Sequence, residues 1–66
     1  MKFKRGDMVY HKTNPELLLL VDQVWIEETQ NEYYTEIVKC CWFDLNNCFQ
    51  QAKFGSDELI LLLCPQ

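Results

Sequence analysis

Four cysteines and a single histidine are the side chains of this sequence best suited to chemistry, as zinc ligands or as reactive thiols. They are Cys40, Cys41, Cys48, Cys64 and His11. The spacing contains no CxxC pair, and the adjacent Cys40 and Cys41 would point to opposite faces of a strand. We therefore expect no metal and no cofactor, and we interpret the thiols as small buried apolar groups.

Catalysis by a nucleophile needs a base and an orienting group beside it. No motif in the sequence links its one histidine, its one serine and its thiols in this way. The paired acids Glu27 and Glu28 are typical of a solvated turn rather than of a general acid and base. His11 shares its parity with Val9, which is typical of a histidine in the core or at its rim. We predict no catalytic residue and no enzymatic activity.

The element that must organise these side chains is the stretch of residues 37–44, IVKCCWFD. It is rich in β-branched and aromatic residues and has no helical period. As a strand it places Val38, Cys40 and Trp42 on one face, while the opposite face includes Lys39. Because the first face carries no charge, we predict that it faces the core.

The 66 residues are enough for one domain, residues 1–66, and a chain of this length buries only about 60% of its unfolded surface. A hydrophobic fraction of 48% with only two glycines and two prolines favours a compact fold over disorder. No apolar run approaches the roughly 18 residues that a membrane helix requires, and we recognise no leader segment. We expect a cytoplasmic protein with reduced thiols and no membrane association.

The first half of the chain contains one ambiguous stretch. Gly6 and Asp7 predict a turn before a short strand over residues 8–12. Before residues 17–26, Asn14 and Pro15 are typical of a helix start. The β-branched and aromatic residues near the end of that stretch favour a strand equally well. The pattern leaves both alternatives open.

The second half is predicted to form a hairpin and a short terminal strand. Residues 45–47 suit a turn between the strand described above and a strand over residues 48–54. Phe49 and Phe54 have opposite parity there, so a bulge or loop must intervene if both are buried. Residues 55–58 predict a helical turn capped by Ser56, followed by an apolar strand over residues 59–63.

Several residues in a fixed order resemble the pattern of the YodC-like family of small, uncharacterised bacterial proteins. They are Gly6, Asp7 and Val9, then Lys12, Pro15, Leu17 and Leu19, then Cys40, Trp42, Phe43 and Asp44, and finally Phe54 and Leu59. The sequence departs from the pattern at Thr13 and Asn14, where the family has a glycine-rich turn, and at His11, where a leucine is usual.

The resemblance implies an all-β fold, a small SH3-like curled antiparallel barrel of about five strands with a short helical turn before the last strand. It favours a strand over residues 17–26. It implies no activity, because none is established for the family.

The sequence contains nine aromatic residues, and a barrel of this size cannot bury them all. Tyr10, Tyr33 and Phe43 fall on the strand faces turned away from the predicted core. If they form a contiguous patch, they are candidates for binding a partner, whereas isolated surface aromatics are ordinary. Both interpretations stay open.

Charge is unevenly distributed along the chain. The net charge is −4, yet residues 1–12 contain four cations and one acid, whereas residues 13–66 contain two cations and nine acids. The overall charge disfavours binding to nucleic acid. Lys4 and Arg5 are nevertheless candidates for a basic edge, with Tyr10 or Tyr33 as a stacking platform for bases.

Leucines occupy both parities in residues 17–20 and 59–63, which a half-exposed antiparallel strand should not show. Unless a helix absorbs them, their outer faces meet another chain, and we expect a homo-oligomer, most simply a two-fold dimer. The leading hypothesis is a non-catalytic interaction module that binds a protein partner or itself through apolar and aromatic surface. The second hypothesis is a nucleic-acid-binding barrel, and the third is a thiol-based metal protein.

Overall fold

The computed structural model describes residues 2–31 and 33–62, and within them the chain is all-β, as predicted. The elements are β1 (Met8–His11), β2 (Asn14–Glu28), β3 (Tyr34–Phe43), β4 (Phe49–Gly55), η1 (Ser56–Glu58), which is a 3₁₀ turn, and β5 (Leu59–Leu61). The strands form one antiparallel sheet in the order β4-β3-β2-β1-β5. The helical turn before the last strand is present, as the resemblance implied.

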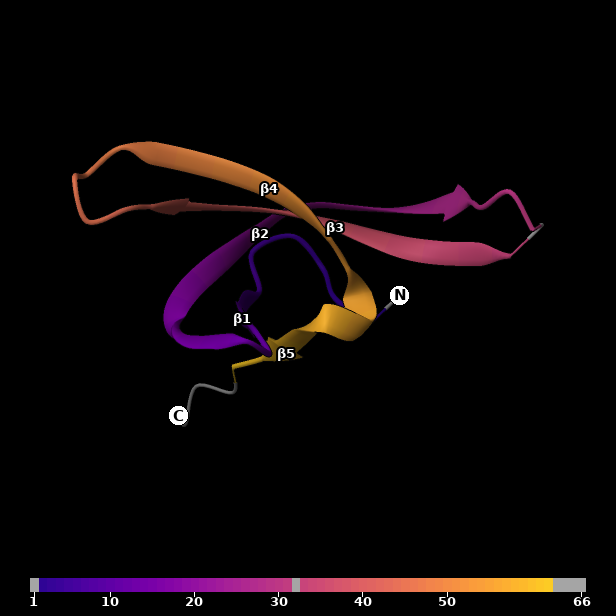
Figure 1. Cartoon of the computed structure of the whole chain (residues 1–66), viewed down its shortest axis with the longest axis horizontal. Helices are drawn as coiled ribbons and strands as arrows, with labels where there is room; N and C mark the ends of the chain where they lie inside the picture. Colours follow the sequence, from indigo (N-terminus) through magenta and orange to yellow (C-terminus); the bar gives the residue numbers. More distant parts are fainter. Residues whose placement is uncertain (1, 32, 63–66) are drawn as a thin grey trace.

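The sheet is curled, but it is not closed into a barrel. β4 and β5 form its two edges, and they do not pair with each other in the described part of the chain. In Figure 1 the β2–β3 and β3–β4 hairpins extend in opposite directions, while β1, η1 and β5 lie together beside the curled start of β2. The predicted curled antiparallel sheet of five strands is therefore confirmed, with one side of the barrel open.

The ambiguous residues 17–26 all lie in β2, the longest strand. Leu19 and Val21 are buried, whereas Leu18 and Leu20 are exposed, so the leucine run alternates as a strand does. The asparagine and proline that could have capped a helix instead begin this strand. The strand alternative is thus confirmed, and no helix absorbs the leucines that point outward.

The core consists of a small set of apolar side chains from the N-terminal segment and from β1, β2, β3 and β5. Its fully or nearly fully buried members are Phe3, Val9, Leu19, Val21, Val38, Cys40 and Leu59. Val38 and Cys40 confirm the predicted core face of residues 37–44, and Trp42 packs against this core while staying partly exposed. The middle of the sheet is occupied by β2 rather than by that stretch, which lies in the neighbouring β3.

Phe49 and Phe54 need no bulge between them, because they lie on opposite faces of the sheet. The pairing of β3 with β4 runs without a shift from Ile37 opposite Gly55 to Phe43 opposite Phe49. Phe54 packs against the core, and Phe49 is 54% exposed on the other face.

The turn before β5 differs from the prediction in its cap. Gly55, not Ser56, is the cap residue of η1, and its N–H donates to Oε2 of Glu58 at 2.7 Å. A carboxylate is a stronger acceptor than a hydroxyl, and Glu58 folds back from the end of the same turn to reach this N–H. β5 ends at Leu61, and Leu63, the predicted end of this strand, lies outside the described residues.

Candidate functional site

The structure does not bring the three predicted surface aromatics together. Tyr33 is 72% exposed in the loop between β2 and β3, and Phe43 lies at the far end of β3, about 33 Å along the strand. Tyr10 is half-buried in β1, where it pairs with Ile60 of β5. Tyr33 is therefore a separate surface residue, whereas Tyr10 and Phe43 belong to a larger apolar face.

That face is built on a row of neighbours that crosses the whole sheet on the side turned away from the core. Met8 pairs with Leu20, Leu20 pairs with Cys41, and Cys41 pairs with Gln51. Just after β5, the N–H of Leu62 donates to the carbonyl of Met8 at 2.9 Å. Because opposed residues of antiparallel strands point to the same face, these side chains lie side by side.

Two cross-strand pairs widen this row. Tyr10 pairs with Ile60 on one side, and on the other side Phe43 and Phe49 pair with their rings edge to face, their centroids 5.5 Å apart. We name as the outer face the nine residues Met8, Tyr10, Leu18, Leu20, Cys41, Phe43, Phe49, Ile60 and Leu62. None of the nine is an acid, a lysine or an arginine, and Lys39 and Lys53 border them on the same side of the sheet, next to Cys41 and Gln51. A contiguous exposed surface of this composition is typical of an interaction site.

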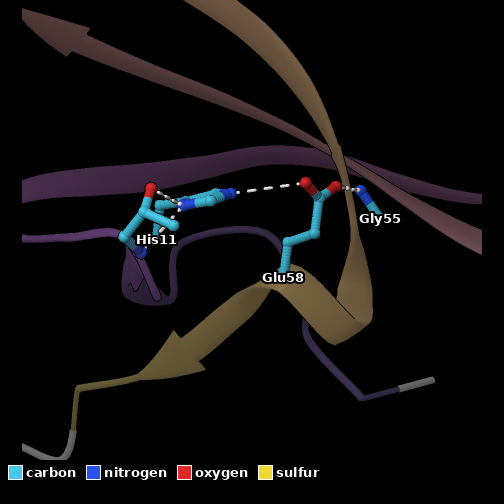
Figure 2. Close-up of polar contacts among 4 residues, drawn as sticks. His11, Gly55 and Glu58 are labelled. Carbon is cyan, nitrogen blue, oxygen red and sulfur yellow. Dashed lines mark hydrogen bonds and ion pairs between the residues drawn. The ribbon is translucent and has the colours of Figure 1, made fainter.

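His11 joins the end of β1 to η1 and to the turn between β1 and β2. The N–H of Thr13 donates to Nδ1 of His11 at 3.1 Å, which leaves Nε2 facing Oε1 of Glu58 at 3.3 Å (Figure 2). The N–H of Gly55, and after it His11, hold the pKa of Glu58 below its ordinary value. The sequence does not indicate this partner of His11, because Glu58 is 47 residues away along the chain.

A hollow of about 230 Å³ opens on the inner, core-side face next to this contact. It is lined by His11, Thr13, Asn14, Leu17, Leu19, Trp42 and Phe54. The rings of His11 and Phe54 lie with their centroids 5.4 Å apart at one wall. Pockets for drug-sized molecules occupy about 300–1,000 Å³, so this hollow suits a single side chain.

The cations of the N-terminal segment lie next to a tryptophan. Lys4 and Arg5 line an open depression together with Trp25. The Nζ of Lys53 lies 5.6 Å from the centroid of the Trp25 ring, and Lys53 pairs across the strands with Lys39. The structure therefore brings the basic residues to an indole ring rather than to the tyrosines that the sequence suggested as platforms. The register of β2, β3 and β4 places Lys53 next to Trp25, and the sequence does not show this register.

The described thiols do not converge on one site, because the adjacent Cys40 and Cys41 lie on opposite faces of β3 and Cys48 lies in the turn after it. Burial, together with the neighbouring Cys41, raises the pKa of Cys40 to about 11. Cys41 is half-buried on the outer face, and Cys48 is exposed in the turn between β3 and β4. Cys64 lies outside the described residues. Within residues 2–31 and 33–62, no three histidine, cysteine or acidic side chains gather as a metal site would require.

Asp44, the last residue of the C-x-W-F-D segment, shapes the turn after β3. Its Oδ1 accepts the N–H groups of Asn46 and Cys48, both at 2.9 Å, and its Oδ2 accepts Nε2 of Gln50 at the same distance. The bond from Cys48 is the largest cause of the lowered pKa of Asp44. The carboxylate is thus occupied as the acceptor that closes this hairpin turn.

The chain matches no family model, no curated protein and no solved structure. The YodC-like resemblance therefore stays a prediction carried by the residues alone. Among the residues described, no helix has the length and apolar character needed to cross a membrane.

Proposed function

We propose that this protein is a non-catalytic interaction module of the cytoplasm that associates with a second copy of itself through the outer face. The observation that supports it most is Leu20, which lies on the middle strand of the sheet and is 41% exposed between Met8 and Cys41. Apolar side chains in the middle of a sheet are normally covered by a second layer. In the described part of the chain no element packs over this face, so a second copy would supply the layer.

A second copy suits this face because of its composition. A two-fold axis places each residue of the face against the same face of the partner, so charged residues there would meet like charges. The nine residues of the outer face are uncharged, while Lys39 and Lys53 flank Cys41 and Gln51 on the same side of the sheet and limit how far the contact can extend. Two such sheets can pack about 10 Å apart. The net charge of −4 on each copy opposes association at long range, and salt screens it. Added salt should therefore leave the association unchanged or strengthen it.

Sedimentation velocity over a wide range of protein concentration tests this proposal. The wild-type chain is expected to shift from monomer to dimer as concentration rises. Leu20→Lys should weaken the dimer by about tenfold or more, because it buries a charge in the interface. Gln30→Lys adds the same charge in the exposed turn between β2 and β3 and should behave as wild type.

The NMR spectrum of each variant shows whether it is folded. A wild-type chain that stays monomeric at all concentrations, or an association that Leu20→Lys leaves unchanged, would contradict the proposal. If the chain stays monomeric and binds an apolar surface of another protein through Leu20, then that protein is its partner instead of a second copy.

A second candidate function, single-stranded nucleic-acid binding, is favoured by one observation, the cations around Trp25. A half-buried indole ring beside Lys4, Arg5 and Lys53 has the composition of a stacking platform with a basic border. It predicts binding of a labelled oligonucleotide that weakens steeply with salt and is lost on charge reversal at Lys4 and Arg5. Fluorescence anisotropy at several salt concentrations measures this. Retained binding after charge reversal would exclude the site.

A further inference from the structure

The two edges of the sheet differ in how well they are protected from pairing with another chain. Short strands, prolines, bulges and charged side chains are the features that keep sheet edges apart. β5 has only three residues, which leaves little backbone for an added strand. β4 has seven residues, no proline and one charged side chain, Lys53, and its pairing with β3 runs without a bulge. Apart from that lysine, the β4 edge lacks these protective features.

The backbone groups of alternate β4 residues point away from β3. The N–H of Asp44 donates to the carbonyl of Cys48, as in the hydrogen-bonded pairs of an antiparallel ladder. Such pairs alternate with non-hydrogen-bonded ones, so every second residue from Phe49 to Gly55 directs its N–H and carbonyl outward. The N–H of Gly55 agrees with this series, because it donates to Oε2 of Glu58 outside the ladder. Two separate bonds therefore fix which residues face outward.

The series leaves three residues with free backbone groups at this edge: Phe49, Gln51 and Lys53. All three are exposed. Within residues 2–31 and 33–62, their backbone N–H and carbonyl groups make no hydrogen bond with a side chain or with backbone outside the strand ladders. The β4 edge is thus a row of donors and acceptors, two residues apart, that an added strand can pair.

A second copy of β4 that runs antiparallel about a two-fold axis at Gln51 fits this row. In that register Gln51 pairs with its own counterpart, and Phe49 pairs with the partner's Lys53, so all three outward residues find a partner. The lysine meets an aromatic ring, which is a favourable cation–π arrangement. On the other face Gln50 lies opposite the partner's Ala52. An axis at Lys53 would instead oppose two like charges and pair fewer residues.

We propose that two copies of this protein pair edge to edge through β4, in antiparallel register about Gln51, and form one continuous sheet. The contact uses backbone groups at the edge, whereas the association proposed above uses side chains of the outer face, so it stands without that proposal. Each backbone hydrogen bond replaces one to water and contributes little net free energy. We therefore expect edge pairing at higher concentration than the face-to-face dimer, and a tetramer where both contacts form.

Amide hydrogen exchange, measured by NMR over a range of concentrations of the full chain, tests the proposal. The N–H groups of Gln51 and Lys53 should exchange about tenfold or more slowly in concentrated than in dilute protein. Face-to-face association leaves these groups at a free edge, so the two proposals can fail separately. Leu20→Lys, which disrupts the face contact, should keep this protection.

Two results of this measurement would overturn edge pairing. The first is exchange at Gln51 and Lys53 that stays fast at every concentration, even if a peptide of another protein slows it. The second is protection that Leu20→Lys abolishes, because the face alone would then cause it.

A proline at the centre of the edge separates backbone pairing from contact between side chains. Gln51→Pro removes an outward N–H and leaves the ladder to β3, a position at which edge strands accept proline. The N–H of Lys53 should then exchange fast at all concentrations. Gln51→Thr keeps the N–H and should show wild-type protection, because threonine suits an exposed strand. Wild-type protection of Lys53 in Gln51→Pro, shown by its NMR spectrum to be folded, would exclude the site.

The register is tested in a mixture of isotope-labelled and unlabelled chains. Non-hydrogen-bonded pairs bring Cα atoms within about 4.5 Å, so a nuclear Overhauser effect is expected between Hα of Gln50 in one copy and Hα of Ala52 in the other. A concentrated sample that lacks this signal would contradict the pairing about Gln51.

Discussion

The Nε2 atom of His11 lies 3.3 Å from Oε1 of Glu58 and joins the end of β1 to the turn that precedes β5. Next to it, the N–H of Lys12 donates to the carbonyl of Glu58 at 3.0 Å. β5 is only three residues long and has a ladder partner on one side, β1, so these contacts hold the edge of the sheet in place. The same contacts fix the rim of the inner hollow.

Acid is expected to destabilise the fold through Glu58 and Asp44. The N–H of Gly55 is the largest cause that holds the pKa of Glu58 below its ordinary 4.5. The N–H of Cys48 is the largest cause that holds the pKa of Asp44 below its ordinary 3.8. A carboxyl with a lowered pKa stabilises the fold above its unfolded pKa and loses that contribution as pH falls through its folded pKa. The melting temperature from circular dichroism should therefore fall progressively below pH 4.5. An equally steep fall in the Glu58→Gln, Asp44→Asn double variant would contradict this assignment.

Adjacent leucines of β2 should respond very differently to truncation. Leu19 is 1% exposed and Leu18 is 47% exposed. Leu19→Ala should cost about 2–5 kcal/mol because it leaves a cavity in the core, a large share of the roughly 3–10 kcal/mol expected for a domain of this size. Leu18→Ala should cost less than about 1 kcal/mol. Urea unfolding followed by tryptophan fluorescence measures both, and similar costs would mean that the assigned faces are wrong.

The described cysteines should react with iodoacetamide in order of exposure. Cys48 is exposed and should be alkylated first, with the half-buried Cys41 second. Cys40 is buried with its pKa raised to about 11, so it should stay unmodified at pH 8 until the chain unfolds. Peptide mass spectrometry of native and urea-treated samples gives the order. Early alkylation of Cys40 in the native sample would contradict its place in the core.

Gly6 should be less replaceable than Gly55. Gly6 has a φ of 94°, which side-chain-bearing residues rarely adopt, although no atom lies within 4 Å of an added Cβ. Gly6→Ala should therefore cost about 1–2 kcal/mol through backbone strain alone. At Gly55 the backbone is ordinary and the closest atom to a new Cβ is an oxygen of the flexible Asp57 side chain, so Gly55→Ala should cost less. Thermal unfolding of both variants decides the order.

Much of the fold followed from residue patterns and from the resemblance. The uncharged alternation of Val38, Cys40 and Trp42 predicted the core side of β3, because a strand separates its side chains with a period of two. The leucines of both parities in β2 predicted an apolar surface facing outward. The prediction that Ser56 caps η1 was wrong, because the acceptor is Glu58, whose side chain lies at the end of the turn rather than at its start.

The candidate sites were less predictable. Tyr10 and Phe43 were selected by parity and do lie on the outer face, but Tyr33 lies in a loop far along β3 from Phe43. Parity defines a face within one strand, whereas a patch depends on which residues of other strands lie alongside. Lys4 lies near Trp25 for the same reason, because two turns, β1 and the first part of β2 separate these residues along the chain.

The sequence by itself determined the core side of β3 and the excess of apolar side chains that the core could not hold, whereas its pattern left residues 17–26 open between strand and helix. These properties depend on local periodicity and composition, which act over a few residues. Only the tertiary structure decided the cross-strand register, the separation of β2 from β3 at Leu20 and Cys41, and the contact of His11 with Glu58. These depend on which distant segments pair, and the free energy of that pairing comes from the curled sheet as a whole.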